Sequence, residues 1–236
     1  MANAWFRFKQ FTVRQDRCAM KVGTDGVLLG AWTDYAGAVR ILDIGTGTGL
    51  LALIAAQRTP DALVDAVEID REAAAQACEN AGESPWSARI AVHRADIRQW
   101  APHLRYDLIL CNPPFYKGHG ASQDQRTAQA KHEGALDLGS LMRSMDRLAA
   151  DGGRASLILP VDRTAEVVEL AEASGFIPVR FCDVHYAEHR PAKRVLVELA
   201  RQTGSITERC RLAVQDRHGA FATAYRELLA DLEEDF

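Results

Sequence analysis

The apolar residues of this chain follow two alternating spacings, and their order predicts an open α/β sheet. Short apolar runs predict buried strands near 41–44, 63–67, 89–92, 107–111 and 155–159. Stretches with helical spacing separate them, near 50–58, 71–81, 138–149 and 162–174. Such strand–helix alternation is typical of a parallel sheet with helices on both faces. The segment Asp151-Gly152-Gly153-Arg154 predicts a turn before the last of these strands.

The two ends of the chain follow different patterns. Residues 6–13 alternate between apolar and polar side chains, which predicts a hairpin strand outside the main sheet. Apolar runs at 177–184 and 194–200 have no helix between them, so they predict a hairpin with an antiparallel last strand. A final helix is expected over 221–232. We therefore expect an N-terminal strand or hairpin extension with a lid over the ligand site (1–36), a main domain (37–203) and a C-terminal segment with a helix (204–236).

Composition is that of an ordinary globular protein of 236 residues, with 47% hydrophobic and 25% charged residues. No apolar run approaches the roughly 18 residues that a membrane-spanning helix needs, and residues 1–7 lack the features of a signal peptide. We therefore expect a cytoplasmic protein without a membrane segment, acting as a monomer. The five cysteines are far apart and form no C-x-x-C pair, so we expect no metal site.

The net charge of −4 is unusual for a protein that binds nucleic acid, because phosphate contacts need local positive charge. Two basic clusters partly offset it. The first lies within residues 7–21, and the second comprises His189, Arg190, Lys193 and Arg194. Each cluster is compatible with an RNA contact or with a simple solvated face.

Candidate chemistry begins at Asn112-Pro113-Pro114-Phe115, which follows the apolar run 106–111. Strands of open α/β sheets present their carboxyl ends to ligands. Each proline restricts φ and removes a backbone donor, so this loop is rich in carbonyl acceptors. An amide, free carbonyls and an aromatic ring suit a flat substrate with an exocyclic NH2 group. A plain surface turn is the alternative.

A second motif, Gly45-Thr46-Gly47-Thr48-Gly49, joins an apolar strand to an Ala/Leu-rich helix and lets the backbone approach a ligand at a helix N-terminus. The next strand ends in Glu68 and Asp70, where an acid would meet a ribose diol. A dinucleotide fingerprint needs a third glycine where this chain has Leu50. Without a pyrophosphate to neutralise, Asp43 before the glycines suits a ligand with an amino group and a sulfonium.

Together these motifs resemble those of the class I S-adenosylmethionine-dependent methyltransferases. The resemblance implies a Rossmann-like, mostly parallel seven-stranded sheet with an antiparallel last strand, and S-adenosyl-L-methionine as cofactor. Its motifs fall in the same order along this chain, ending with an adenine-side Asp and N-P-P-F. The cofactor-binding residues that it implies are Asp43, Gly45, Gly47, Gly49, Glu68, Asp70, Asp96, Ile97 and Asn112.

Finer resemblance comes from the segments 20–32, 131–133 and 193–198, which are similar to those of bacterial tRNA1(Val) adenine-N6 methyltransferases. This family modifies the adenine just 3′ of the anticodon, so the resemblance implies a tRNA substrate. The acidic tail 231–236 departs from what a segment near RNA leads us to expect. The substrate-binding residues that we expect are Lys21, Thr24, Asp25, Phe115, Tyr116, Lys117, His132, Arg190, Lys193 and Arg194.

The catalytic residues expected from this resemblance are Asn112, Pro113, Pro114 and Phe115. The Asn112 side-chain oxygen and the Pro113 carbonyl would accept the two N6 hydrogens, and an aromatic ring would stack on the flipped adenine. Alignment and carbonyl dipoles would supply most of the acceleration, without a strong base or a metal.

Four other interpretations remain open. A glutamine side chain in a protein, or an adenine in DNA, offers a similar planar NH2 group to N-P-P-F. A non-enzymatic RNA-binding protein could have kept the fold. An NAD-dependent dehydrogenase fits less well because of Leu50 and the final hairpin.

Overall fold

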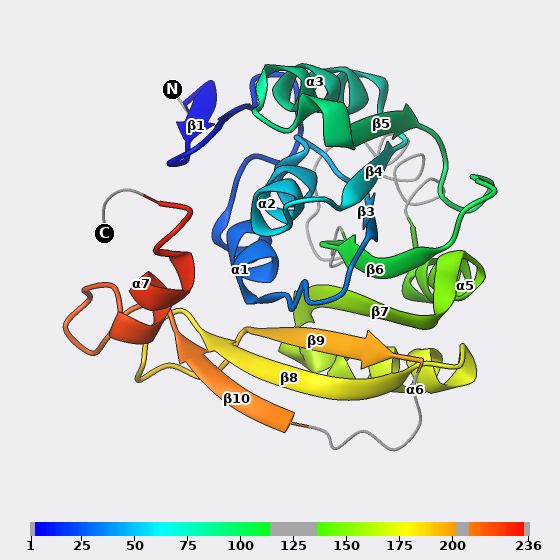
Figure 1. Ribbon diagram of the computed structural model, residues 1–236. Coiled ribbons are helices and arrows are strands. Elements are labelled where there is room, and N and C mark those ends of the chain that lie inside the picture. The colour runs from blue at the N-terminus through cyan, green and yellow to red at the C-terminus, as the bar shows by residue number, and fades with distance from the viewer. Residues whose placement is uncertain (1–2, 114–135, 202–207, 234–236) are drawn as a thin grey trace, which may run out of the picture.

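A twisted sheet forms the centre of the computed structural model, which describes residues 3–113, 136–201 and 208–233 (Figure 1). In these residues the sheet has eight strands in the order β10-β8-β9-β7-β6-β3-β4-β5. The strands are β3 (Arg40–Ile44), β4 (Leu63–Glu68), β5 (Ile90–Arg94), β6 (Tyr106–Cys111), β7 (Ala149–Pro160), β8 (Ile177–His185), β9 (Arg194–Ala200) and β10 (Glu208–Ala213). All neighbours pair in parallel except β9, which is antiparallel to both β7 and β8.

The predicted α/β sheet and its antiparallel strand β9 are confirmed, but the sheet has one strand more than the seven that we expected. The additional strand, β10, pairs in parallel with the outer side of β8. Its first residues, Glu208-Arg209-Cys210-Arg211, are exposed and mostly polar, so no apolar run marks it in the sequence. The main sheet therefore includes residues that we had assigned to the C-terminal segment.

Helices cover both faces of this sheet (Figure 1). One face carries α1, α2, α3 and α7, and the other carries α5 and α6. Each face has its own core of buried apolar side chains. The helices are α1 (Thr24–Trp32), α2 (Leu50–Arg58), α3 (Arg71–Glu83), α5 (Leu138–Leu148), α6 (Thr164–Ala173) and α7 (Thr223–Leu229), with short 3-10 turns η1 (Ser87–Arg89) and η2 (Val161–Arg163).

The N-terminal extension, for which we predicted a strand or hairpin, also contains helix α1. Every residue from Gly26 to Trp32 is buried, so the helix belongs to the core. A Cβ atom at Gly30 would lie 2.7 Å from Ile54 Cδ1, so α1 and α2 pack closely there and a larger residue would force the Ile54 side chain to shift. Because α1 is apolar on all sides, it lacks the one-sided periodicity that reveals a surface helix.

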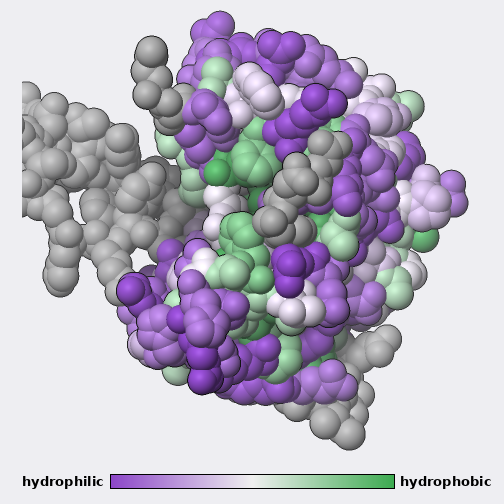
Figure 2. Space-filling model, turned by 90° about the vertical axis from the view of Figure 1, so that its left-hand side faces the viewer, coloured by the Kyte–Doolittle hydropathy of each residue, from purple (hydrophilic) through white to green (hydrophobic). Residues whose placement is uncertain are grey.

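The predicted hairpin outside the main sheet is confirmed: β1 (Trp5–Arg7) and β2 (Thr12–Arg14) pair as a separate antiparallel sheet. The Lys9 backbone N–H donates to the Leu232 carbonyl at 2.8 Å, so the described parts of the two chain ends lie together. Figure 2 shows this face of the molecule, with a narrow hydrophobic band between hydrophilic flanks.

Two boundaries differ from the sequence prediction. The glycines at 152 and 153 lie inside β7 rather than before it. The pairing with β6 is irregular there, because residues 150–153 stand opposite Asp107 alone. The C-terminal helix is α7, shorter than the predicted 221–232. In the described part of the chain, no helix is long and apolar enough to cross a membrane.

Candidate functional site

The glycine loop lies between β3 and α2, and all three of its glycines have left-handed φ values: 68° at Gly45, 56° at Gly47 and 85° at Gly49. The backbone N–H groups of Gly45 and Thr46 donate to the Val67 carbonyl at 2.9 and 3.1 Å, which ties the loop to β4. A Cβ atom added at Gly45 or Gly47 would meet no atom within 4 Å. The loop therefore borders open space rather than packed protein.

Asp43 holds this loop from behind. Its side chain is fully buried, and one carboxylate oxygen accepts hydrogen bonds from Thr46 Oγ1 at 2.5 Å and from the Ala52 N–H at 3.2 Å. Burial raises the pKa of Asp43 to about 7. The direct ligand contact that we expected for Asp43 stays a prediction, since the carboxylate faces the loop and α2 in this structure.

Glu68, at the end of β4, bridges the glycine loop and the start of α3. One carboxylate oxygen accepts from the Gly47 N–H and the other from the Asp70 N–H, each at 2.9 Å. A carboxylate oxygen has a second acceptor position. Glu68 therefore lies beside the loop with capacity left for ligand hydroxyls.

The other predicted cofactor residues lie along the neighbouring strand ends, outside the cavity lining. Asp70 caps α3 by accepting from the Ala73 N–H at 2.8 Å. Asp96, after β5, accepts three hydrogen bonds from the Arg98 side chain, and these bonds lower the pKa of Asp96. Ile97 is buried. The cofactor roles of these three residues remain predictions.

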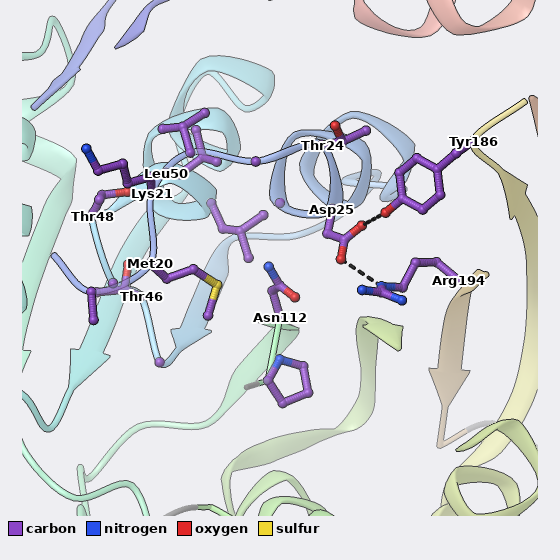
Figure 3. Close-up of a pocket in the computed structure, with 18 residues that line it drawn as sticks. Met20, Lys21, Thr24, Asp25, Thr46, Thr48, Leu50, Asn112, Tyr186 and Arg194 are labelled. Carbon is purple, nitrogen blue, oxygen red and sulfur yellow. Dashed lines mark hydrogen bonds and ion pairs between the residues drawn. The ribbon is translucent and has the colours of Figure 1, made fainter. Parts of the chain in front are cut away.

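A cavity of about 550 Å³ opens in front of the glycine loop (Figure 3). Ligand sites commonly occupy about 300–1,000 Å³. Residues far apart in sequence line it: Ala19, Met20, Lys21, Val22, Gly23, Thr24, Asp25, Gly26, Gly45, Thr46, Gly47, Thr48, Leu50, Leu51, Asn112, Pro113, Tyr186 and Arg194. The structure thus brings together eight of the residues predicted from sequence: Lys21, Thr24, Asp25, Gly45, Gly47, Asn112, Pro113 and Arg194.

Asn112 lies directly after β6, between the glycine loop on one side of the cavity and Asp25 on the other (Figure 3). Its side chain packs near the first turn of α1, since a Cβ atom at Gly26 would lie 3.7 Å from Asn112 Nδ2. Pro113 is buried beside it. The remaining predicted residues of this region, Pro114, Phe115, Tyr116, Lys117 and His132, lie outside the described residues.

Asp25, Tyr186 and Arg194 form a polar cluster on the wall opposite the glycine loop (Figure 3). The Tyr186 hydroxyl donates to Asp25 Oδ1, and Arg194 Nε donates to Asp25 Oδ2 at 2.7 Å. Burial, together with the bond to Asp25, raises the pKa of Tyr186. We call these three residues the Asp25 cluster. Sequence reasoning missed Tyr186, whose only signal was its position in the turn after β8.

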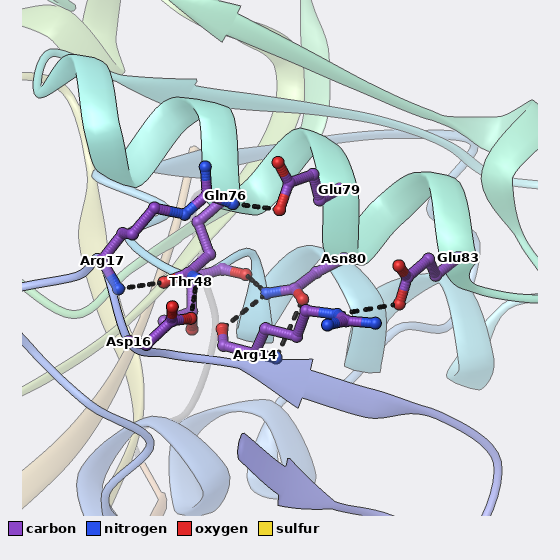
Figure 4. A network of polar contacts seen from close by, with 8 residues as sticks. All are labelled: Arg14, Asp16, Arg17, Thr48, Gln76, Glu79, Asn80 and Glu83. Carbon is purple, nitrogen blue, oxygen red and sulfur yellow. Dashed lines mark hydrogen bonds and ion pairs between the residues drawn. The ribbon is translucent and has the colours of Figure 1, made fainter. Parts of the chain in front are cut away.

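Buried amides on α3 hold the N-terminal segment beside the glycine loop (Figure 4). Asn80 Oδ1 accepts from the Arg14 N–H at 2.9 Å, while its Nδ2 donates to the carbonyls of Arg14 and Thr48. Gln76 Oε1 accepts from the Arg17 N–H at 3.0 Å. Both side chains are fully buried or nearly so. They therefore join β2 and the chain after it to the loop that borders the cavity.

Gln15 continues this arrangement toward the cavity. Its Oε1 accepts from the Val22 N–H at 2.8 Å, and its Nε2 donates to the Asn3 carbonyl at 3.0 Å. Val22 lines the cavity. We call Gln15, Gln76 and Asn80 the amide brace, and none of them was predicted, because single amides carry no sequence pattern.

The cysteines and the possible metal ligands are the other groups whose chemistry bears on this site. Burial raises the pKa of Cys111 well above its ordinary value, which opposes a nucleophilic role for the residue just before Asn112. Cys18 and Cys182 are buried as well, while Cys78 and Cys210 are exposed. Among the described residues, no group of His, Cys, Asp and Glu side chains could hold a metal ion.

A mostly parallel sheet, a glycine loop beside a cavity and an Asn-Pro pair at a strand end define a class I methyltransferase. Comparisons with known proteins agree with this class. Residues 23–138 match the family model "Methyltransferase small domain". A predicted O-methyltransferase from Agrobacterium tumefaciens shares the fold, with a TM-score of 0.68, 24% identity, and coverage of 88% of this chain and 96% of that one.

Two curated relatives narrow the family. A tRNA1(Val) (adenine(37)-N6)-methyltransferase from Klebsiella pneumoniae is 47% identical over 231 residues, covering 96% of this chain and 93% of the relative. One from Parabacteroides distasonis is 39% identical over 239 residues, covering 100% and 98%. This chain belongs to the tRNA1(Val) (adenine(37)-N6)-methyltransferase family.

Proposed function

We infer that this protein transfers the methyl group of S-adenosyl-L-methionine to the exocyclic N6 of an adenine in tRNA. One observation carries the inference: Asn112 and Pro113 border the same cavity as the glycine loop. That arrangement allows a methyl donor and a planar amine to meet at the end of β6.

The residues present fit this cofactor. The open space beside Gly45 and Gly47 is where a ligand could approach the backbone closely. Glu68 retains acceptor positions for ribose hydroxyls, and Asp96 follows the adjacent strand. When bound, S-adenosyl-L-methionine supplies an electrophilic methyl group on a sulfonium.

The remaining chemistry belongs to the chain's own residues. The N6 lone pair of adenine is delocalised into the ring, so the free amine is a poor nucleophile. The Asn112 side-chain oxygen and the Pro113 carbonyl would accept its two hydrogens and favour a tetrahedral nitrogen. Their dipoles also stabilise the positive charge that develops on nitrogen. Holding the amine in line with the methyl group lowers the activation barrier through proximity and alignment. Pro114 and Phe115 complete this proposed catalytic set.

The substrate follows from the relatives, whose names specify adenine 37 of tRNA1(Val). We propose the same nucleotide here, and with it a cytoplasmic monomer that acts on tRNA. Lys21, Thr24, Asp25, Arg190, Lys193 and Arg194, with Tyr116, Lys117 and His132, are the proposed substrate contacts.

Nucleoside mass spectrometry tests this function. Unmodified total tRNA is incubated with the purified protein and S-adenosyl-L-methionine that carries a deuterated methyl group. We expect labelled N6-methyladenosine. If the protein binds the cofactor but labels no nucleoside, the tRNA assignment fails, and a protein glutamine or a DNA adenine becomes the substrate to test.

A further inference from the structure

Two loops meet at the edge of the sheet that carries Asn112. They follow β8 and β10, which run parallel to each other and in the same direction as β6 and β7. In Figure 1 both loops lie at the left-hand ends of these strands, next to α7. We call residues 186–193 and 214–221, taken together, the ledge.

Backbone hydrogen bonds join the two loops into one unit. The Val214 N–H donates to the His185 carbonyl and the Glu188 N–H donates to the Gln215 carbonyl, each at 2.8 Å. Asp216 closes the tip of the second loop by accepting from two backbone N–H groups, and Gly219 supplies the left-handed φ of 86° that the turn needs. A surface held in this way can present side chains at defined positions.

The ledge is continuous with the cavity. Tyr186, the first residue of the ledge, lines the cavity wall. Arg194, which directly follows the first loop of the ledge, lines it as well. A polymer whose nucleotide enters the cavity beside Asn112 would therefore pass close to the ledge.

The ledge is basic in a protein whose net charge is −4. Its exposed cations are Arg190, Lys193 and Arg217. Its two acids are already engaged: Glu188 pairs with Arg217, and Asp216 accepts from its own turn. In the described part of the chain, no acidic side chain forms an ion pair with Arg190 or Lys193.

The N-terminal basic cluster differs in this respect. Arg14 pairs with Glu83 at 3.1 Å, and Arg17 pairs with Glu79, so α3 neutralises both arginines. In that cluster Lys21 also lines the cavity, with its ammonium group on the Asn3 carbonyl, so the difference concerns Arg14 and Arg17. Phosphate contacts fix the register of a nucleic acid on a protein.

We propose that the ledge binds the phosphate backbone of the substrate RNA beside the target adenosine, with Arg190 and Lys193 as its main contacts. This proposal rests on the proposed function, because it assumes an RNA substrate. It assigns the ledge to positioning and affinity, and it leaves the methyl transfer to the cavity.

The test is a charge reversal, Arg190→Glu with Lys193→Glu, compared with the wild type. The affinity for unmodified tRNA is measured by filter binding at several salt concentrations, and cofactor affinity by calorimetry. We expect at least about tenfold weaker tRNA binding and a salt slope lower by about one for each lost phosphate contact. Cofactor affinity stays unchanged, which also reports that the variant is folded.

Arg105→Glu is the matched control, because Arg105 is exposed just before β6, at the opposite edge of the sheet. It changes the net charge without touching the ledge, so tRNA affinity should hold. The neutral pair Arg190→Gln with Lys193→Gln should give a smaller loss in the same direction, and it serves if the reversal does not fold.

The outcomes separate this proposal from the function on which it rests. Wild-type protein that methylates tRNA, with unchanged tRNA affinity and salt slope in both ledge variants, overturns the ledge alone. An equal loss in the Arg105 control also overturns it, since the effect would then follow net charge. Wild-type protein that neither binds nor methylates tRNA overturns the proposed function itself.

Discussion

The two walls of the cavity are built in different ways. The glycine-loop wall is made of backbone, held from behind by buried side chains such as Asp43 and Asn80. The opposite wall is the Asp25 cluster, whose three side chains come from α1, the turn after β8 and the start of β9. We propose that the first wall binds the cofactor and the second contacts the substrate. Asn112 lies between them.

The largest effect is expected at Asn112, which lies between the two walls. Asn112→Ala removes the amide oxygen proposed to orient the amine, so turnover should fall by about two orders of magnitude, the range for losing one such electrostatic group. Cofactor affinity, measured by calorimetry, should change little, because the glycine-loop wall is intact. Near-normal turnover at saturating substrates would remove Asn112 from the mechanism.

The second test loosens the glycine-loop wall without touching the cavity. Asn80→Ala leaves backbone groups of Arg14 and Thr48 without their partner, and an unsatisfied buried group costs about 1–3 kcal/mol. We expect cofactor affinity to weaken by roughly tenfold, which corresponds to about 1.4 kcal/mol. Turnover at saturating cofactor should remain close to that of the wild type.

Glu83→Gln is the control for Asn80→Ala. It lies on the same helix and removes an exposed ion pair with Arg14, so cofactor affinity should not change. An equal loss of affinity in both variants would mean that any change on α3 acts through general stability. The positioning role of the amide brace would then be wrong.

A smaller effect is expected at the opposite wall. Tyr186→Phe removes one of the two bonds that hold Asp25 and keeps the one from Arg194. We expect kcat/KM for tRNA to fall by about threefold, the scale of one net hydrogen bond, with cofactor affinity unchanged. Tyr35→Phe is the control, since that buried hydroxyl donates to the Gly30 carbonyl away from the cavity. A change in cofactor affinity with an unchanged kcat/KM for tRNA would contradict the assignment of Tyr186 to the wall opposite the glycine loop.

The last test concerns the stability of the glycine-loop wall rather than turnover. Burial raises the pKa of Asp43 to about 7, above an ordinary value of 3.8. The protonated carboxyl is favoured in the folded state, so its contribution is fully present below pH 4 and is lost as the pH rises through 7. Urea midpoints of the apo protein should fall between pH 5 and pH 8, and Asp43→Asn should reduce that fall. Parallel profiles would contradict the assignment.

The two walls also differ in how far the sequence predicts them. The glycine loop and Asn112 lie in short continuous motifs after apolar runs, and local pattern is enough to place both at strand ends. The Asp25 cluster joins residues up to 169 positions apart, and no local pattern records that contact. Tyr186 was therefore missed.

The same limit applies to the fold. Strands β3 to β9 carry apolar runs and were predicted. Mostly exposed β10, and α1, which is buried from Gly26 to Trp32, lack the contrast between faces on which periodicity depends. The roles of Arg14 and Arg17 were also hidden, because their partners Glu83 and Glu79 lie on a distant helix. Tertiary contacts, rather than propensities, decided each of these cases.

The most direct test of the central claim uses two tRNA1(Val) transcripts that differ only at position 37, with adenine in one and guanine in the other. Each is incubated with the protein and S-adenosyl-L-methionine that carries a labelled methyl group. The account predicts labelled N6-methyladenosine in the adenine transcript and no label in the guanine transcript. Equal labelling of both transcripts would contradict it, because the methyl group would then go to a site other than the amine that Asn112 and Pro113 are proposed to hold.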